Sequence, residues 1–184
     1  MIRSSYLNSV NYRDIFSTLM FGKKFNSIVE IGILDGFSLQ SIVNNIDSSC
    51  TINAYDIFEE FNGNHAESSK VIEMFKEYDN VHIDYGNFYE LYKTIPDNSL
   101  DMLHIDIAND GNIYNYVIEN YMQKLKKDGI LIMEGGSIER DNVEWMIKYD
   151  KEPIYPIVNN LKDKYDICTV GNVPSITIIK QKNY

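Results

Sequence analysis

The stretch from Ser27 to Ser38 contains two glycines and two carboxylates close together. An apolar run ends at Glu30, the glycines Gly32 and Gly36 follow, and an amphipathic segment begins directly after them. Glycine lets the backbone turn tightly and approach a ligand closely, and the first turn of a helix presents free N–H groups and a positive dipole end. The pattern is typical of a β-strand that leads into a helix at a nucleotide site, with an ordinary strand-turn-helix as the alternative.

Further polar residues follow the next two predicted strands. Asp56 comes directly after the strand expected at 51–55, where an acidic side chain can accept hydrogen bonds from both hydroxyls of a ribose. Asn87 and Phe88 follow the strand expected at 81–85, where an amide and an aromatic ring can contact the edge and the face of a purine. Because ligands of an open α/β sheet bind at the carboxyl ends of its strands, these residues predict one shared nucleotide site, with plain surface turns as the alternative.

Short apolar runs alternate with amphipathic segments along the chain, without a Pro/Gly/Ser-rich linker or an internal repeat. Strands that alternate with helices form parallel sheets, so we expect a doubly wound, mostly parallel seven-stranded α/β sheet with helices on both faces. The residues 171–174 are too few for a parallel crossover, so the last two strands must form an antiparallel hairpin. We expect a single domain over 1–184, with an N-terminal helical segment at 1–26 and a core at 27–184. The expected strands are 28–31, 51–55, 81–85, 100–107, 130–133, 166–170 and 175–180.

Local signals predict where helices begin, end and bury their apolar faces. Asn64 with Glu67, and Asp141 with Glu144, have the spacing of capping boxes. The apolar stripe over 113–125 predicts one long helix. The residues expected to form the buried face of the helix after Glu67 are Val71, Ile72, Phe75 and Tyr78.

The composition excludes several classes of protein. An apolar content of 44% with 12% aromatic residues suits a folded domain with a substantial core and excludes a disordered chain. A net charge of -10 argues against nucleic acid as a partner, because proteins that bind phosphate backbones gather Lys and Arg on one face. The sequence has no apolar run of about 18 residues and no signal-peptide centre, so we expect no membrane contact and a cytoplasmic location. Cys50 and Cys168 lie far apart, so neither a disulfide framework nor a structural zinc site is expected.

The segment 27–180 resembles the class I S-adenosylmethionine-dependent methyltransferases, whose seven-stranded, Rossmann-like sheet ends in a reversed hairpin strand. Their first motif, an acidic residue followed by Gly-x-x-x-Gly, matches Glu30 to Gly36, and their ribose-binding acid matches Asp56. A nicotinamide-type Gly-x-Gly-x-x-Gly is absent, which makes a dehydrogenase the poorer interpretation. The resemblance implies that S-adenosylmethionine is bound by Glu30, Gly32, Ile33, Leu34, Asp35, Gly36, Ser38, Asp56, Ile57, Asn87, Phe88 and Asp106.

Two later segments, 103–106 and 125–131, look like the small-molecule O-methyltransferases related to macrocin and catechol methyltransferases. That likeness implies that the chain methylates a hydroxyl group of a small acceptor of the sugar or natural-product type. It also implies an in-line displacement, in which the acceptor oxygen attacks the sulfonium methyl group.

Metal-dependent members of this group hold magnesium with an acid that ends the fourth strand and with acidic or amide residues that end the fifth. Asp106 matches the first position. Glu134 stands at the second position but is followed by two glycines where an Asp or Asn is usual, and Asn109 or Asp110 would have to complete the set. The resemblance therefore implies that Asp106 and Glu134 are the catalytic residues and candidate Mg²⁺ ligands.

Other roles and functions stay open. Without a metal, Asp106 would position or deprotonate the acceptor itself, with His65 as an alternative base and His104 as an expected core residue. Four residues of the later part of the chain would line an acceptor pocket, a subunit interface of a homodimer, or a packed aromatic patch: Trp145, Met146, Tyr149 and Tyr155. A catalytically idle cofactor-binding module or partner subunit, a nucleic-acid methyltransferase and a protein methyltransferase are the alternative functions. The turn after Asp106 lacks the Asn/Asp-Pro-Pro-aromatic pattern of amino-methylating DNA enzymes.

Overall fold

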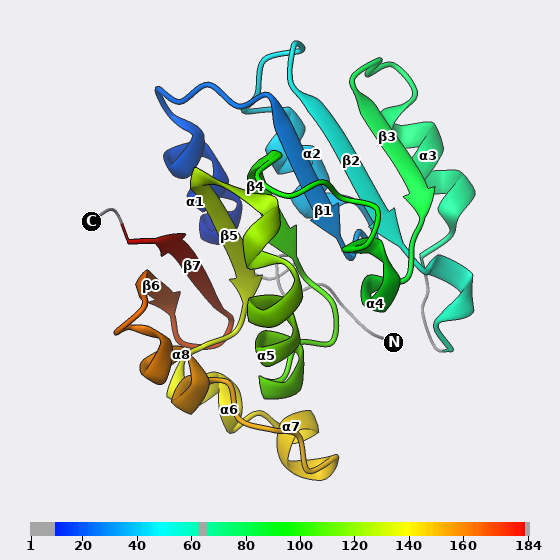
Figure 1. Ribbon diagram of the computed structural model, residues 1–184. Coiled ribbons are helices and arrows are strands. Elements are labelled where there is room, and N and C mark those ends of the chain that lie inside the picture. The colour runs from blue at the N-terminus through cyan, green and yellow to red at the C-terminus, as the bar shows by residue number, and fades with distance from the viewer. Residues whose placement is uncertain (1–9, 63–65, 183–184) are drawn as a thin grey trace. The chain divides into compact units, whose positions relative to one another are not determined.

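The computed structural model describes residues 10–62 and 66–182, and it describes side chains from residue 14 onward. Strands and helices alternate along these residues (Figure 1). They form two compact units, Met1–Thr94 and Ile95–Tyr184.

The first unit contains three parallel strands. Its strands are β1 (Ser27–Ile31), β2 (Thr51–Asp56) and β3 (Val81–Tyr85), and β2 pairs with both of the others. Its helices are α1 (Val10–Met20), α2 (Phe37–Val43), the 3-10 helix η2 (Phe58–Glu60), α3 (Ser68–Phe75) and α4 (Phe88–Leu91). The three strands lie where the sequence predicted them, because each is a short apolar or alternating segment bounded by turn residues.

The start of α3 differs from the predicted capping box. Asn64 lies outside the described residues, and Glu67 is the N-cap residue without a side-chain cap bond. The Glu59 carboxylate takes over this task and accepts the backbone N–H of Ser68 at 2.7 Å and its hydroxyl at 2.9 Å.

The buried face of α3 is narrower than predicted. Val71 and Phe75 are buried, whereas Ile72 is 49% exposed and Tyr78 is 37% exposed. The prediction was wrong for Ile72 and Tyr78 because α3 lies beside β3, the edge strand, where both line a hollow of about 240 Å³.

The second unit contains four strands of mixed direction. Its strands are β4 (Leu100–Ile105), β5 (Leu125–Glu134), β6 (Tyr165–Gly171) and β7 (Ser175–Gln181). Its helices are α5 (Gly111–Asn120), the 3-10 helix η3 (Met122–Lys124), α6 (Ile138–Asp141), α7 (Glu144–Lys148) and α8 (Tyr155–Leu161). Strands β4 and β5 are parallel, and β7 is antiparallel to both β5 and β6, which confirms the predicted hairpin.

The long helix predicted over 113–125 was wrong at its end. Helix α5 stops at Asn120, and Leu125 is the first residue of β5, where it pairs with Leu100. A Cβ at Gly129 would lie 2.8 Å from the carbonyl oxygen of Leu100, so glycine permits the close approach of the two strands. Periodicity misled the prediction because Leu125 is fully buried in either arrangement.

The predicted cap at Asp141 was also wrong. Helix α6 is capped by the Ser137 hydroxyl, which accepts the N–H of Arg140 at 3.0 Å. The Asp141 carboxylate instead accepts the N–H groups of Ile154 and Tyr155, both at 2.8 Å, at the start of α8. Asp141 therefore joins α6 to α8 rather than starting α7.

The strands follow the order β3-β2-β1-β4-β5-β7-β6 in a seven-stranded sheet. The expected α/β fold, mostly parallel with a C-terminal antiparallel hairpin, is confirmed. This topology is typical of sheets whose ligands meet the carboxyl ends of the parallel strands.

Candidate functional site

The turn between β1 and α2 is held by the carboxylate of Asp56, the last residue of β2. Asp56 Oδ2 accepts the backbone N–H groups of Ile33 at 2.7 Å and Leu34 at 2.9 Å. Its other oxygen, Oδ1, accepts the N–H of Phe58 at 2.7 Å. Hydrogen bonds to an ionised acceptor are stronger than neutral ones, so this carboxylate fixes the shape of the turn.

Three residues of the turn have positive φ angles: Gly32 at 93°, Leu34 at 48° and Gly36 at 78°. Glycine adopts this region freely, whereas a residue with a side chain loses about 1–2 kcal/mol. A Cβ at Gly36 would also lie 3.0 Å from the ring of Phe75. Leu34 therefore has an unfavourable backbone conformation, and the hydrogen bond that its N–H donates to Asp56 helps to maintain it.

The remaining residues expected around the turn differ in their exposure. Glu30, Ile33 and Ser38 are 0%, 2% and 4% exposed, so their side chains support the turn from within. Asp35 and Ile57 are half-buried. The N–H groups of Gly32 and Gly36 donate to the carbonyl oxygens of Tyr55 at 2.8 Å and Ile33 at 2.9 Å, so backbone bonds also hold the turn.

The loop after β3 contains the two residues expected to contact a purine. The Asn87 side chain is exposed, and its Oδ1 accepts the N–H of Tyr89 at 3.0 Å as the N-cap of α4. Its NH₂ group has two donors that this cap does not use. Phe88 is only 5% exposed, and its ring meets that of Tyr89 edge-on with centroids 5.0 Å apart. The ring of Tyr89, 51% exposed, lies at the surface of this loop, whereas that of Phe88 does not.

In the second unit, the ends of β4 and β5 are joined by Asn109. Asp106, half-buried, directly follows β4. The Asn109 amide donates from Nδ2 to the carbonyl oxygens of Ile105 and Glu134, both at 3.1 Å. Asp110 caps α5 by accepting the N–H of Ile113 at 3.0 Å. Asn109 and Asp110, which were candidates to complete a metal site, therefore support the backbone.

Glu134 forms a buried, two-pronged ion pair with Arg140. Arg140 Nε donates to Oε1 at 2.6 Å and Nη2 donates to Oε2 at 2.9 Å. The side chains of Arg140 and Glu134 are 7% and 6% exposed. Burial raises the pKa of the Glu134 carboxyl, and the hydrogen bonds and charge of Arg140 oppose that rise. Sequence reasoning missed Arg140, because only the fold brings it back to the end of β5.

The glycines after Glu134 leave no place for another ligand side chain. Gly135 and Gly136 have φ angles of 101° and 111°. A Cβ at Gly135 would lie 2.6 Å from Ile154 Cδ1, and one at Gly136 would collide with Thr177 Oγ1. Tight packing around this turn therefore explains the glycines at the position where an Asp or Asn was expected.

These donors do not fit the expected magnesium ion. Both oxygens of Glu134 are engaged by a guanidinium, and among the described residues no three His, Cys, Asp or Glu side chains are grouped as metal ligands are. Magnesium requires near-octahedral oxygen coordination. Mg²⁺ at Asp106 and Glu134 is thus unsupported.

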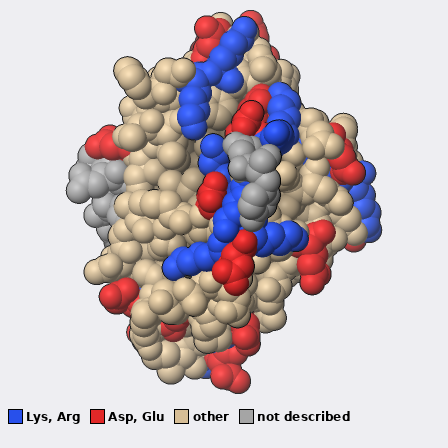
Figure 2. Space-filling model, turned by 60° about the vertical axis from the view of Figure 1, so that its left-hand side comes forward, with Lys and Arg blue, Asp and Glu red and all other residues tan. Residues whose placement is uncertain are grey.

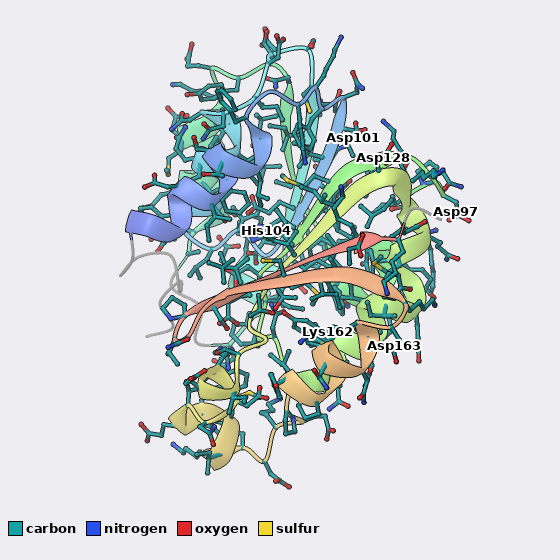
Figure 3. The ribbon with its side chains drawn as sticks, turned by 90° about the vertical axis from the view of Figure 1, so that its left-hand side faces the viewer. Asp97, Asp101, His104, Asp128, Lys162 and Asp163 are labelled. Atoms are coloured by element: carbon teal, nitrogen blue, oxygen red, sulfur yellow. The ribbon has the colours of Figure 1, made fainter. Side chains whose placement is uncertain are left out.

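The other candidate bases and aromatic residues separate in the structure. His104 is fully buried within β4, as expected for a core residue (Figure 3), and His65 lies outside the described residues. Met146 is buried, Tyr149 is 62% exposed, and the half-buried ring of Trp145 lies against Arg140. Tyr155 lines a hollow of about 300 Å³ between α6, α8 and β6.

The surface charges are interleaved. On the face that Figure 2 shows, Lys and Arg side chains lie beside Asp and Glu. Lys126 pairs with Asp101 at 2.8 Å, and Lys124 pairs with Asp97 at 2.6 Å. Figure 3 places both aspartates at the end of the sheet from which β4 starts. Among the described helices, none has the length and apolar character needed to cross a bilayer.

Comparison with known proteins assigns the chain to a family. A family model described as a methyltransferase domain matches residues 29–134, more than half of the chain. Curated proteins yield no match.

Solved structures share the fold at low sequence identity. The methyltransferase PaMTH1 of Podospora anserina, bound to S-adenosylhomocysteine (SAH), is 17% identical to this chain. Its TM-score is 0.69 over 95% of this chain and 80% of that one. A putative caffeoyl-CoA O-methyltransferase from Staphylococcus aureus is 20% identical, with a TM-score of 0.69 over 94% and 84%. The O-methyltransferase from Bacillus cereus in complex with SAH is 13% identical, with a TM-score of 0.67 over 94% and 82%.

Proposed function

Because the chain belongs to the methyltransferase-domain family, we propose that it transfers the methyl group of S-adenosylmethionine to an oxygen atom of a small hydroxylated acceptor. The observation that carries the proposal is the turn after β1, where Asp56 holds the N–H groups of Ile33 and Leu34. Of the three solved structures reported above, two contain SAH, the product that the cofactor leaves, and two are described as O-methyltransferases.

We assign the parts of S-adenosylmethionine to different residues of the first unit. The backbone of 32–36 would hold the methionine end, and Asp56 would bind the ribose. A carboxylate has about four acceptor positions, and Asp56 already uses three of them on backbone N–H groups. Asp56 would therefore accept one ribose hydroxyl with the turn in this conformation. Asn87, through its amide donors, would contact the adenine edge.

The reaction would be an in-line displacement. When bound, S-adenosylmethionine would supply an electrophilic methyl group. The acceptor oxygen would attack the methyl carbon, the carbon–sulfur bond would break with its electrons going to sulfur, and the acceptor proton would go to a base. Asp106, half-buried after β4, is the proposed base and positioning group. Alignment of nucleophile, methyl and sulfur can contribute about 7–11 kcal/mol, so a weak base suffices where positioning is good.

Calorimetric titration with S-adenosylmethionine and SAH, with NAD as control, tests the cofactor. Saturable binding of the first two alone supports the proposal. Binding of NAD alone, or of none of the three, refutes it.

A catalytically idle cofactor-binding module is the second candidate. One observation favours it: the Glu134 carboxylate, expected in catalysis, is engaged by Arg140. Cofactor binding without methyl transfer to a panel of sugars and phenols would select this alternative, and turnover of any acceptor would exclude it.

A further inference from the structure

Arg140 places a permanent positive charge at the end of β5. Its guanidinium meets the Glu134 carboxylate through two parallel hydrogen bonds, of 2.6 and 2.9 Å. This arrangement is the one in which an arginine binds a carboxylate most specifically. Arginine stays protonated in proteins, so the positive charge at Glu134 does not depend on a bound ligand.

The surroundings of the guanidinium are enclosed. Nη2 also lies 3.4 Å from the carbonyl oxygen of Asn109, and the ring of Trp145 covers the guanidinium at 5.0 Å from its centroid. Nη1 is buried and has no hydrogen-bond partner among the described residues. The guanidinium is therefore almost fully buried, and the face of the Trp145 ring adds attraction.

A divalent cation would need the same space and the same oxygens. Each Glu134 oxygen is already paired with a guanidinium nitrogen, and the next two residues have no room for a side chain. One buried oxygen is left over, Oδ1 of Asn109, which has no partner among the described residues. This neutral oxygen lies beside a guanidinium, and among the described residues no three His, Cys, Asp or Glu side chains, Asp106 included, are grouped as metal ligands are. Magnesium requires several oxygen ligands and is repelled by the neighbouring positive charge.

We propose that the guanidinium of Arg140 occupies the space beside the Glu134 carboxylate in which a divalent metal ion would otherwise bind. The ends of β4 and β5 then bind no Mg²⁺, and methyl transfer needs none. The second half of this inference rests on the proposed function. Arg140 acts through Glu134, so it is a positioning residue and not a catalytic one.

The first test is a titration of the wild-type protein with Mn²⁺, a paramagnetic substitute for Mg²⁺. The chain has a single tryptophan, so the emission of Trp145 reports on the surroundings of Arg140. We expect no saturable quenching up to millimolar Mn²⁺, and free Mn²⁺ measured by electron paramagnetic resonance equal to the amount added. One bound Mn²⁺ that quenches Trp145 and is lost in Glu134→Gln would overturn the inference. Mn²⁺ bound without quenching, and unchanged by Glu134→Gln, is bound elsewhere and supports it.

The second test removes the resident charge. Arg140→Met keeps an apolar stem of similar length but leaves the buried Glu134 carboxylate unpaired, so the melting temperature should fall. Mn²⁺ or Mg²⁺ should then raise it again, because the ion enters the place of the guanidinium. Arg140→Lys, which keeps the charge, should show no such metal effect. A variant whose loss of stability no metal reverses would show that Arg140 is only structural.

The Mn²⁺ titration of the wild-type protein tests the proposed role of Arg140 even if Arg140→Met does not fold. SAH binding, measured on the same wild-type sample, separates the two proposals. If SAH does not bind, the proposed function is refuted, and the conclusion about the metal is unaffected. If SAH binds and Mn²⁺ also binds at Glu134, only the proposed role of Arg140 is overturned. Once an acceptor is known, methyl transfer should be equal in EDTA and in Mg²⁺.

Discussion

The carboxylate of Asp56 accepts the backbone N–H of Ile33 at 2.7 Å, and this bond joins the end of β2 to the glycine turn after β1. The same oxygen also accepts the N–H of Leu34, a residue with a φ of 48°. The residue expected to bind the ribose thus also shapes the loop expected to bind the methionine end. The two halves of the proposed cofactor site therefore depend on one side chain.

Replacement of Asp56 should weaken cofactor binding. Asp56→Ala removes three charge-assisted hydrogen bonds to backbone N–H groups, so we expect SAH affinity to fall about tenfold or more, which is about 1.4 kcal/mol. Asp56→Asn keeps one oxygen acceptor and should lose less. Calorimetry with SAH measures both, and Asp79→Ala, at an exposed position of the same unit, is the control. Equal affinity in Asp56→Ala and wild type would remove Asp56 from the site.

Two glycine substitutions separate strain from crowding. Gly22 and Gly36 have φ angles of 69° and 78°, but a Cβ at Gly22 meets nothing within 4 Å, whereas one at Gly36 meets the Phe75 ring at 3.0 Å. Gly22→Ala should cost about 1–2 kcal/mol of unfolding free energy from the backbone alone. Gly36→Ala should cost more and also reduce SAH affinity. Urea unfolding and calorimetry measure the two effects, and a smaller loss in Gly36→Ala than in Gly22→Ala would contradict this account.

The Glu134–Arg140 pair should show strong coupling. Removal of either partner, by Glu134→Leu or Arg140→Met, leaves a buried charge alone and should cost about 3–5 kcal/mol of unfolding free energy. The double variant should be more stable than the sum of the two losses predicts, because neither charge is then left unpaired. Lys126→Met, at a pair with more exposed side chains, should cost at most about 1 kcal/mol. A double-mutant cycle by urea unfolding measures the coupling, and additive losses would argue against it.

Tyr114 should make the protein less stable at high pH. Burial raises the pKa of the Tyr114 hydroxyl above its ordinary value of 10.0, and the hydroxyl contacts the carbonyl oxygens of Glu134 and Gly135, both at 3.2 Å. Above about pH 10 the unfolded chain releases this proton while the folded chain keeps it, so stability falls as the pH rises.

Tyr114→Phe should remove that part of the alkaline loss. At neutral pH the variant should be less stable by about 1 kcal/mol because the hydroxyl contacts are lost. Urea unfolding between about pH 8 and pH 11 compares it with wild type, and Tyr89→Phe, at an exposed ring, is the control. A difference between wild type and Tyr114→Phe that does not change with pH would show that Tyr114 ionises normally.

Much of the fold was predictable from the sequence because its signals are local. The strands at 51–55 and 81–85 alternate apolar with polar residues between turn residues, and the structure has them as Thr51–Asp56 and Val81–Tyr85. The hairpin followed from the length of the loop at 171–174, which no parallel crossover can use. The spacing of Gly32 and Gly36 likewise predicted the turn after β1, because few other residues adopt positive φ without strain.

The errors arose where a side chain can pack against, or hydrogen-bond to, either of two elements. Leu125 continued a helical period but lies in a strand, because burial alone does not reveal which element surrounds a residue. Asp141 has cap spacing toward Glu144 but accepts N–H groups at Ile154 and Tyr155, since a carboxylate bonds to whichever free donors the fold brings near.

The class of the fold, the glycine turn and the acidic residue after the second strand follow from the amino-acid sequence, because spacing and backbone sterics act over a few residues. The role of each carboxylate depends on the tertiary structure. Asp56 turned out to hold the loop, and Glu134 to hold Arg140, because a hydrogen bond depends on which donors lie within about 3 Å, and only folding brings such donors together.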